Sequence, residues 1–120
     1  MRNFRNYIEY DVVESTNFVA ITIDEDGVYF DIKDGVEENE IQLDQQDTLG
    51  LYDWLVRNEE NTFHAKCSIN PLDSIQLIQD HEGLHYQVTD QYDDTLEVQT
   101  SLLGLDNLIK KLYESIYGEE

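Results

Sequence analysis

The five residues His81-Glu82-Gly83-Leu84-His85 fit the H-E-x-x-H pattern of zinc hydrolases. In those enzymes the pattern lies on a helix, where two His side chains one turn apart bind zinc and the Glu acts as general base. Here Gly83 disfavours a helix, and no His or Glu follows at a spacing suited to a third ligand. A zinc-dependent hydrolase that uses His81, Glu82 and His85 is therefore the least favoured of the functions considered.

Two other groups of residues could bind metal, but their spacing argues against it. His64 and Cys67 would point to opposite faces of a strand, so the thiol is expected in the core. The run "DEDG" from Asp24 resembles the start of a calcium loop, but the sixth and twelfth positions are Tyr29 and Gly35 instead of Gly and Glu. No P-loop or nucleophile motif occurs. We therefore predict no catalytic residue, no cofactor and no metal, and expect that the protein is not an enzyme.

The chain contains an internal repeat. The segment from Asp26 to Ile32 aligns with that from Glu82 to Val88, with an offset of 83 − 27 = 56 between their glycines. Farther along, Ile41-Gln42-Leu43 aligns with Leu96-Glu97-Val98 at an offset of 55. The repeat places the H-E-x-x-H run at a hairpin turn, and the protein is therefore expected to bind no stoichiometric zinc.

Alternating apolar residues predict the strands of each half. The buried positions of the opening strands are expected to be Ile8, Tyr10 and Val12 in the first half and Phe63, Ala65, Cys67 and Ile69 in the second. Each half then ends in a helix. The first is expected to be capped by Asp47 and the second to begin at Thr100 or Ser101, ahead of an apolar stripe through Leu105, Leu108 and Leu112.

These patterns predict one α+β domain over residues 1–120. It would consist of two tandem pseudo-repeats of four antiparallel strands plus one helix, at about 7–58 and 63–118, with the helices on one face of the sheet. This order of elements is similar to that of Pur-type and Whirly-type nucleic-acid-binding units. The similarity covers the order of elements only and includes no sequence motif.

The charge of the chain limits its possible partners. Against 27 Asp and Glu stand 7 Lys and Arg, which gives a net charge of −20 with His neutral. Such a chain repels nucleic acid and anionic membranes, so a charged partner is expected to be basic. The hydrophobic content of 40% is enough for a folded core. A single Cys and the lack of a signal or membrane-spanning run suggest a cytoplasmic location.

We therefore expect a small binding protein, encoded by a phage or bacterium, that occupies the basic nucleic-acid-binding surface of a partner protein as a DNA or RNA mimic. The alternative is an immunity or chaperone-like protein that neutralises a basic toxin or effector. The oligomeric state is left open. The residues predicted to contact the partner lie on turns and outward strand positions: Asp24, Glu25, Asp26, Tyr29, Asp31, Glu37, Glu38, Glu40, Tyr92, Asp93, Asp94 and Glu97.

Overall fold

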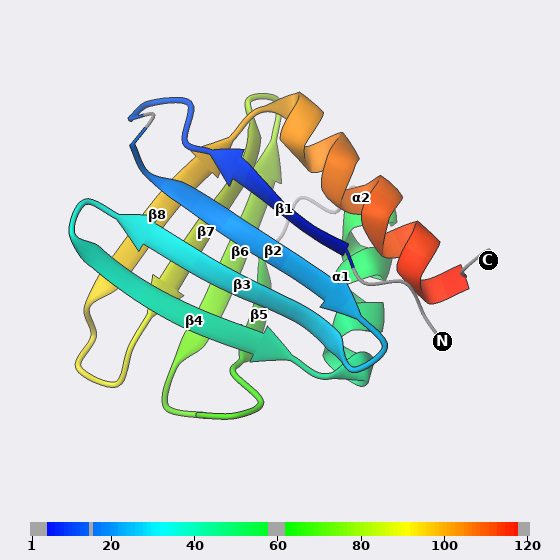
Figure 1. Ribbon diagram of the computed structural model, residues 1–120, viewed down its shortest axis with the longest axis horizontal. Helices are drawn as coiled ribbons and strands as arrows, with labels where there is room; N and C mark the ends of the chain where they lie inside the picture. Colours follow the sequence, from blue (N-terminus) through cyan, green and yellow to red (C-terminus); the bar gives the residue numbers. More distant parts are fainter. Residues whose placement is uncertain (1–4, 15, 58–61, 118–120) are drawn as a thin grey trace.

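The computed structural model describes residues 5–14, 16–57 and 62–117, which form two antiparallel sheets and two helices (Figure 1). Sheet A has the order β1 (Arg5–Tyr10), β2 (Phe18–Asp24), β3 (Gly27–Asp34) and β4 (Glu37–Leu43), followed by α1 (Gln45–Arg57). Sheet B has the order β5 (Phe63–Lys66), β6 (Ser74–Asp80), β7 (Gly83–Thr89) and β8 (Thr95–Thr100), followed by α2 (Leu102–Tyr117). The predicted α+β fold with two tandem repeats is confirmed. The predicted repeat limits at 58 and 118 lie outside the described residues.

The strand register gives the alignment of the two repeats. Phe30 pairs with Ile41 in sheet A, and the equivalent Tyr86 pairs with Val98 in sheet B. The offset in the fourth strand is therefore 98 − 41 = 57, and the sequence alignment of Ile41 with Leu96 was wrong. The sequence does not distinguish the two offsets well, because apolar residues alternate along the strand and Ile41 can be aligned with Leu96 as well as with Val98.

The first strand also differs from its prediction. Ile8, Tyr10 and Val12 are exposed, and Tyr7 packs against the core instead. Tyr7 lies opposite the buried Ile21, and residues opposite each other in a sheet share one face. A shift of one residue therefore turns the expected apolar set outward.

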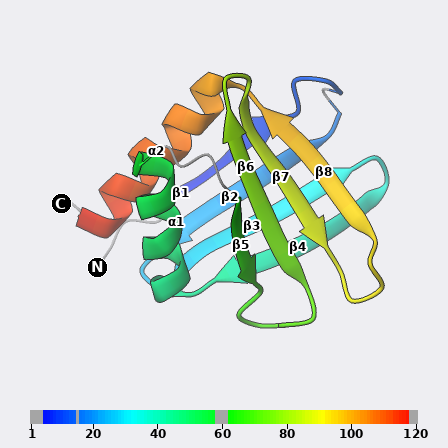
Figure 2. The same ribbon diagram turned by 180° about the vertical axis from the view of Figure 1, so that it is seen from behind.

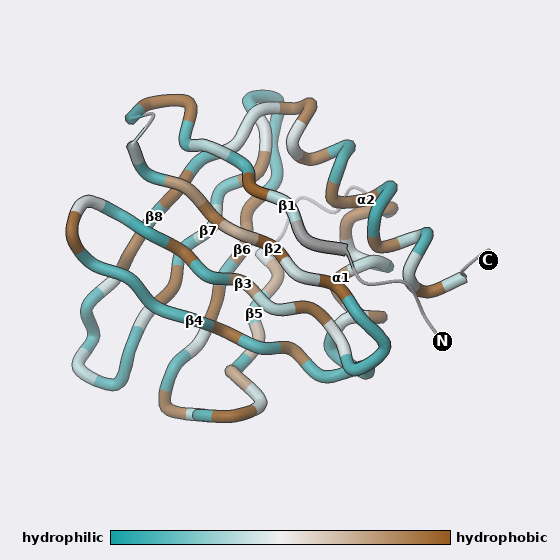
Figure 3. Tube along the Cα trace, in the orientation of Figure 1, coloured by the Kyte–Doolittle hydropathy of each residue, from teal (hydrophilic) through white to brown (hydrophobic). Residues whose placement is uncertain are grey.

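The two sheets face each other across a single core. Phe30 of β3 and Tyr86 of β7 meet there, with their ring centroids 5.6 Å apart. The alternation of hydrophobic and hydrophilic residues along β3 and β4 in Figure 3 reflects one buried and one solvent-facing side. Burial of these side chains is the main stabilising contribution to the fold.

Both helices lie at the same end of the molecule (Figures 1 and 2). Helix α1 contacts β3, β4 and β5, while α2 contacts β1, β2, β7 and β8. Each helix thus packs against strands of both sheets, and the two helices also contact each other. Helix α1 is capped by Asp44, whose Oδ1 accepts a hydrogen bond from the amide of Asp47 at 2.9 Å. The predicted cap Asp47 lies in the first turn instead, whereas Ser101 caps α2 as predicted.

Two equivalent seams join the sheets at their edges. At one, the amide of Ser68 donates to the carbonyl of Gln42 at 2.7 Å. At the other, the amide of Val12 donates to the carbonyl of Gln99 at 2.8 Å. Because Ser68 is 56 residues after Val12 and Gln99 is 57 after Gln42, each seam repeats the other with the roles of the halves exchanged. The molecule therefore has an approximate two-fold symmetry.

Candidate functional site

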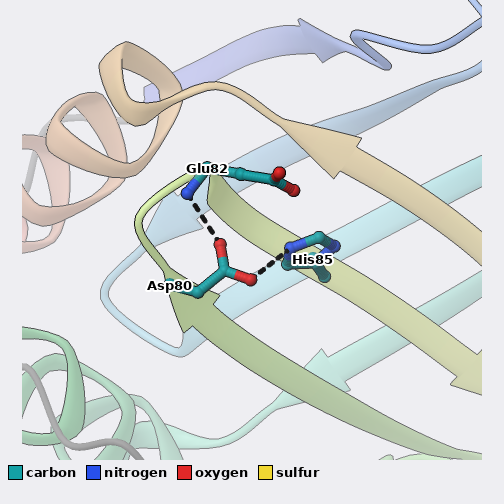
Figure 4. Close-up of side chains that lie close together, drawn as sticks. All are labelled: Asp80, Glu82 and His85. Carbon is teal, nitrogen blue, oxygen red and sulfur yellow. Dashed lines mark hydrogen bonds and ion pairs between the residues drawn. The ribbon is translucent and has the colours of Figure 1, made fainter.

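The H-E-x-x-H run begins in the turn between β6 and β7 with His81 and Glu82 and continues into β7, where His85 lies (Figure 4). Its two imidazoles have different environments, because the side chain of His81 is 88% exposed while that of His85 is 17% exposed. His85 Nε2 lies 3.1 Å from Asp80 Oδ2, and Asp80 Oδ1 accepts a hydrogen bond from the Glu82 amide at 2.8 Å. The run is a hairpin turn as predicted, and Asp80 is the partner of His85 that the motif did not indicate.

Asp80, Glu82 and His85 each offer one ligand atom, and these atoms lie within 4.8 Å of one another. The pKa of Asp80 is lowered, first by the hydrogen bond from the Glu82 amide and further by His85. A catalytic zinc site also uses three protein ligands, but here only one of the three is an imidazole, and His81 is not among them. The absence of stoichiometric zinc stays a prediction, to be checked by metal analysis of the purified protein. Zinc that is lost in His85→Ala would contradict it.

The predicted carboxylates of the β2–β3 turn lie beside the helices. Asp24 Oδ1 accepts a hydrogen bond from the Asp26 amide at 2.9 Å, so Asp24 helps to form the turn. The Gln45 side chain of α1 donates to the carbonyl of Glu25 and ties the turn to the helix. Glu25 and Asp26 expose their carboxylates, whereas Asp24 is half-buried. Only Glu25 and Asp26 are thus exposed charges without a part in closing the turn.

The outer face of sheet A carries the densest group of predicted residues. Asp31 of β3 lies directly opposite Glu40 of β4, and Glu38 lies two residues before Glu40 on the same face. These three residues, which we call the acidic cluster, line a shallow depression together with Asn39. Tyr29 donates a hydrogen bond to Glu40 Oε1 at 3.2 Å.

The pKa values report the electrostatics of the acidic cluster. The pKa of Asp31 is raised by partial burial, then by the charges of Glu38 and Glu40. The pKa of the Tyr29 hydroxyl is also raised, chiefly because it donates to Glu40. Among the side chains that the structure describes, no Lys or Arg forms an ion pair with the acidic cluster. The fold thus gathers three carboxylates on one face, where Lys33 lies opposite Glu38 without forming an ion pair with it.

The β3–β4 and β7–β8 turns lie at the end of the molecule opposite the helices (Figure 1), and they carry the remaining predicted residues except Glu97. Tyr92, 75% exposed, and the adjoining Asp93 and Asp94 form the β7–β8 turn, where Asp90 accepts hydrogen bonds from the amides of Tyr92 and Asp94. Glu37 begins β4 and is exposed. Glu97 lies on the outer face of sheet B, where it accepts a hydrogen bond from Gln87.

One contact between the repeats was not foreseen. Asp34 Oδ2 accepts from the amide of Glu97 at 3.3 Å, and Asp34 Oδ1 accepts from the side chain of Asn17 at 3.1 Å. Asn17 in turn accepts from the amide of Gly35 at 2.8 Å. These bonds hold the β3–β4 turn against β8 and bring Glu37 to the end of the molecule that carries Asp93. The alternation of apolar and polar residues does not indicate such a loop contact.

The predicted residues therefore fall into three groups: the β2–β3 turn beside the helices, the acidic cluster with Tyr29 on the outer face of sheet A, and the turns at the opposite end. Glu97 belongs to none of these groups and lies on β8. No model of a known protein family matches the sequence, and comparison with curated proteins finds no match. Of the helices in the described residues, neither is long and apolar enough to span a membrane.

Proposed function

We propose that this protein is a small, non-enzymatic binding protein that occupies the basic nucleic-acid-binding surface of a partner protein. Its carboxylates would take the place of phosphates. The observation that carries the proposal is the acidic cluster, where Asp31, Glu38 and Glu40 share one outward sheet face. The pKa of Asp31 is raised there by partial burial and then by the charges of Glu38 and Glu40. Like charges held close together destabilise the folded protein. A partner that neutralises them removes this repulsion, and its removal favours binding.

The size of the molecule also supports the proposal. Its longest extent is 38 Å, and duplex DNA carries about 20 phosphates over a comparable span, at one charge per ~1.7 Å of axis. The net charge of −20 is of the same magnitude. The predicted carboxylates lie on β3, β4 and their turns, from the β2–β3 turn beside the helices to the β3–β4 turn at the opposite end (Figure 1). A basic groove that binds a duplex would meet negative charge at both ends and in the middle of this face.

The test begins with capture of partners from bacterial lysate at low salt, followed by elution with rising salt. A captured partner should bind this protein and duplex DNA competitively, and its affinity should fall steeply between about 0.05 M and 0.5 M salt because of screening. Binding that DNA does not compete, to a partner with toxin activity, would replace mimicry with the immunity or chaperone-like alternative.

Charge-neutralising variants sharpen the test. Glu38→Gln combined with Glu40→Gln should weaken binding at low salt about tenfold, chiefly through slower association, and the glutamine can still accept from Tyr29. Asp53→Asn combined with Asp106→Asn removes the same charge from exposed positions on the helices and serves as the matched control. It also removes the Asp53–Arg57 ion pair, which is an exposed pair and contributes at most about 1 kcal/mol. Equal effects of the two pairs would mean that only the total charge matters.

A further inference from the structure

The outer face of sheet A is divided into an apolar half and an acidic half. Its apolar half, which we call the apolar strip, consists of Ile8, Tyr10, Phe18 and Ala20 on β1 and β2. Ile8 is 47% exposed and Tyr10 57% exposed, and the rings of Tyr10 and Phe18 meet edge to face with centroids 6.3 Å apart. In Figure 1 this face is turned toward the viewer, and no helix crosses it.

The strand register places the apolar strip directly against the acidic half. Two rows cross the four strands on this face: Ile8, Ala20, Asp31 and Glu40 form one, and Tyr10, Phe18, Lys33 and Glu38 form the other. Neighbours within a row have Cβ atoms about 5 Å apart. Ala20 thus borders Asp31, whereas Phe18 borders Lys33, which separates it from Glu38. A ligand that covers the apolar strip reaches the acidic cluster through the row of Ala20.

The second repeat shows that the fold does not require this pattern. The equivalent rows on the outer face of sheet B are His64, Gln76, Gln87 and Glu97, and Lys66, Ser74, Thr89 and Thr95. Polar side chains therefore stand where sheet A has Ile8, Tyr10, Phe18 and Ala20. Because the same backbone accepts polar residues at these positions, the fold does not require the rings of Tyr10, which is exposed, and Phe18, which is partly exposed. Clustered exposed apolar residues beside charge mark interaction surfaces.

We propose that the outer face of sheet A is the docking face of this protein, and that it receives a segment of a partner protein with apolar side chains beside Lys or Arg on one side. The proposal rests on the proposed function and names the part of the surface that performs it. Tyr10 and Phe18 bury apolar area against the segment, while Asp31, Glu38 and Glu40 pair with its cations. Charge complementarity favours this occupant over a second copy, because two chains of −20 repel each other.

The two halves of the docking face make separable contributions. The acidic cluster attracts the segment and sets the dependence on salt, since exposed charges are screened. The apolar strip slows dissociation, and salt does not screen its contribution. A segment with cations alone should therefore bind weakly, and one with apolar residues as well should retain affinity at high salt.

The test uses defined peptides and isotope-labelled protein followed by NMR. The first probe is a helical Leu/Lys peptide of about 14 residues, which spans about 21 Å. The second is an oligolysine of equal charge. The Leu/Lys peptide should bind at least about tenfold more tightly and should shift the amide signals of β1 to β4 rather than those of sheet B. Equal affinity of the two peptides, shifts centred on sheet B or the helices, or dimerisation of the protein through this face would overturn the proposal.

Variants locate the apolar contribution. Tyr10→Ser combined with Phe18→Ser should remove the advantage of the Leu/Lys peptide and leave oligolysine binding unchanged. His64→Ser combined with Gln76→Ser alters the equivalent face of sheet B and should change neither. If the aromatic double variant fails to fold, Ile8→His serves instead, since the second repeat carries His64 at that position, and it should reduce the advantage at least about threefold.

The outcome is separate from that of the proposed function. Peptide binding on sheet A without competition between the protein and DNA for a captured partner would keep the docking face and reject mimicry. Competition with DNA that the Tyr10 and Phe18 variant does not weaken would keep mimicry and reject this face.

Discussion

A buried hydroxyl without a partner is the clearest local defect of the core. Tyr86 is fully buried, and its hydroxyl has no hydrogen-bond partner among the described residues. Burial raises the pKa of this hydroxyl well above its usual value, with a smaller contribution from Tyr7. The equivalent residue of the first repeat is Phe30, so the backbone accepts an aromatic ring without the oxygen.

Tyr86→Phe should therefore raise the free energy of unfolding by about 1 kcal/mol, because it removes an unsatisfied polar group from the core. Urea unfolding of both proteins measures the change. Tyr29→Phe is the control, since the Tyr29 hydroxyl donates to Glu40 and its removal should give no such gain. A loss of stability in Tyr86→Phe would show that the hydroxyl is bonded, for example to a buried water.

We expect Asp31 to lower the stability of the folded protein and to contribute to partner binding. Its pKa is higher in the folded protein than in the unfolded chain, so the folded state binds the proton more tightly. Stability therefore falls as the pH rises from the unfolded pKa through the folded one. At pH 7, Asp31→Asn should raise the unfolding midpoint by about 1 to 3 °C, and the difference should vanish below about pH 3.

Thermal unfolding of wild type and Asp31→Asn at the two pH values measures this effect. Asp106→Asn removes an exposed charge from α2 and corrects for the general benefit of lowering the net charge. An equal rise of the unfolding midpoint in the two variants would mean that the rise comes from the lower net charge and not from the surroundings of Asp31. The same Asp31→Asn substitution should weaken partner binding, as expected of a surface kept for function rather than stability.

At the level of elements, the hairpins before α1 and α2 depend on one glycine each. Gly27 and Gly83 have φ of 137° and 136°, and a Cβ at either would lie 2.0 Å from a backbone carbonyl oxygen, that of Leu43 or of Thr100. At each of these glycines, the first residue of the third strand touches the backbone at the end of the fourth strand, so no Cβ fits between them. These glycines fix the register from which the rows of the docking face follow.

Gly83→Ala should lower the free energy of unfolding by more than about 3 kcal/mol or prevent folding, because strain and a backbone clash add together. Gly35→Ala is a matched control, since Gly35 also has a positive φ of 70° but has open space around its Cβ position. It should cost only about 1 to 2 kcal/mol. Urea unfolding of both variants distinguishes the two costs, and equal losses would contradict the clash.

The sequence predicted the type and order of the helices and strands better than it predicted which residues of each strand face the core. Hairpins at Asp26-Gly27 and Glu82-Gly83 were predictable, because the residues there have a strong local preference for turns. The face of β1 was not, because Tyr7 and Tyr10 are equally suited to either side of a strand. The offset of 56 applied upstream would have paired Tyr7 with Phe63 and corrected the phase. The apolar strip was missed for this reason.

The sequence predicted only part of the candidate site, because alternation along a strand indicates which residues face outward but not which distant residues they contact. The outward positions of Tyr29, Asp31 and Glu40 follow from simple alternation along β3 and β4. With Ile8, Tyr10 and Val12 expected in the core, Glu9 and Asp11 between them would have faced outward. Instead, Glu9 accepts a hydrogen bond from Asn107 of α2, and Asp11 is buried. Local patterns do not reveal such contacts, which join residues distant in sequence.

For the whole molecule, the two seams imply an order of folding. They have the same geometry, but the seam between Gln42 and Ser68 closes a loop of 68 − 42 = 26 residues, whereas that between Val12 and Gln99 closes one of 99 − 12 = 87. The longer closure costs about 1 kcal/mol more chain entropy. The seam near Ser68 should therefore form early, and that near Val12 should form last and open first. Faster hydrogen exchange at the amides of Val12 and Gln99 than at those of Ser68 and Gln42 would reveal this sequence of events. The apolar strip ends beside Val12. A partner bound to the strip would therefore stabilise the seam between Val12 and Gln99, which forms last.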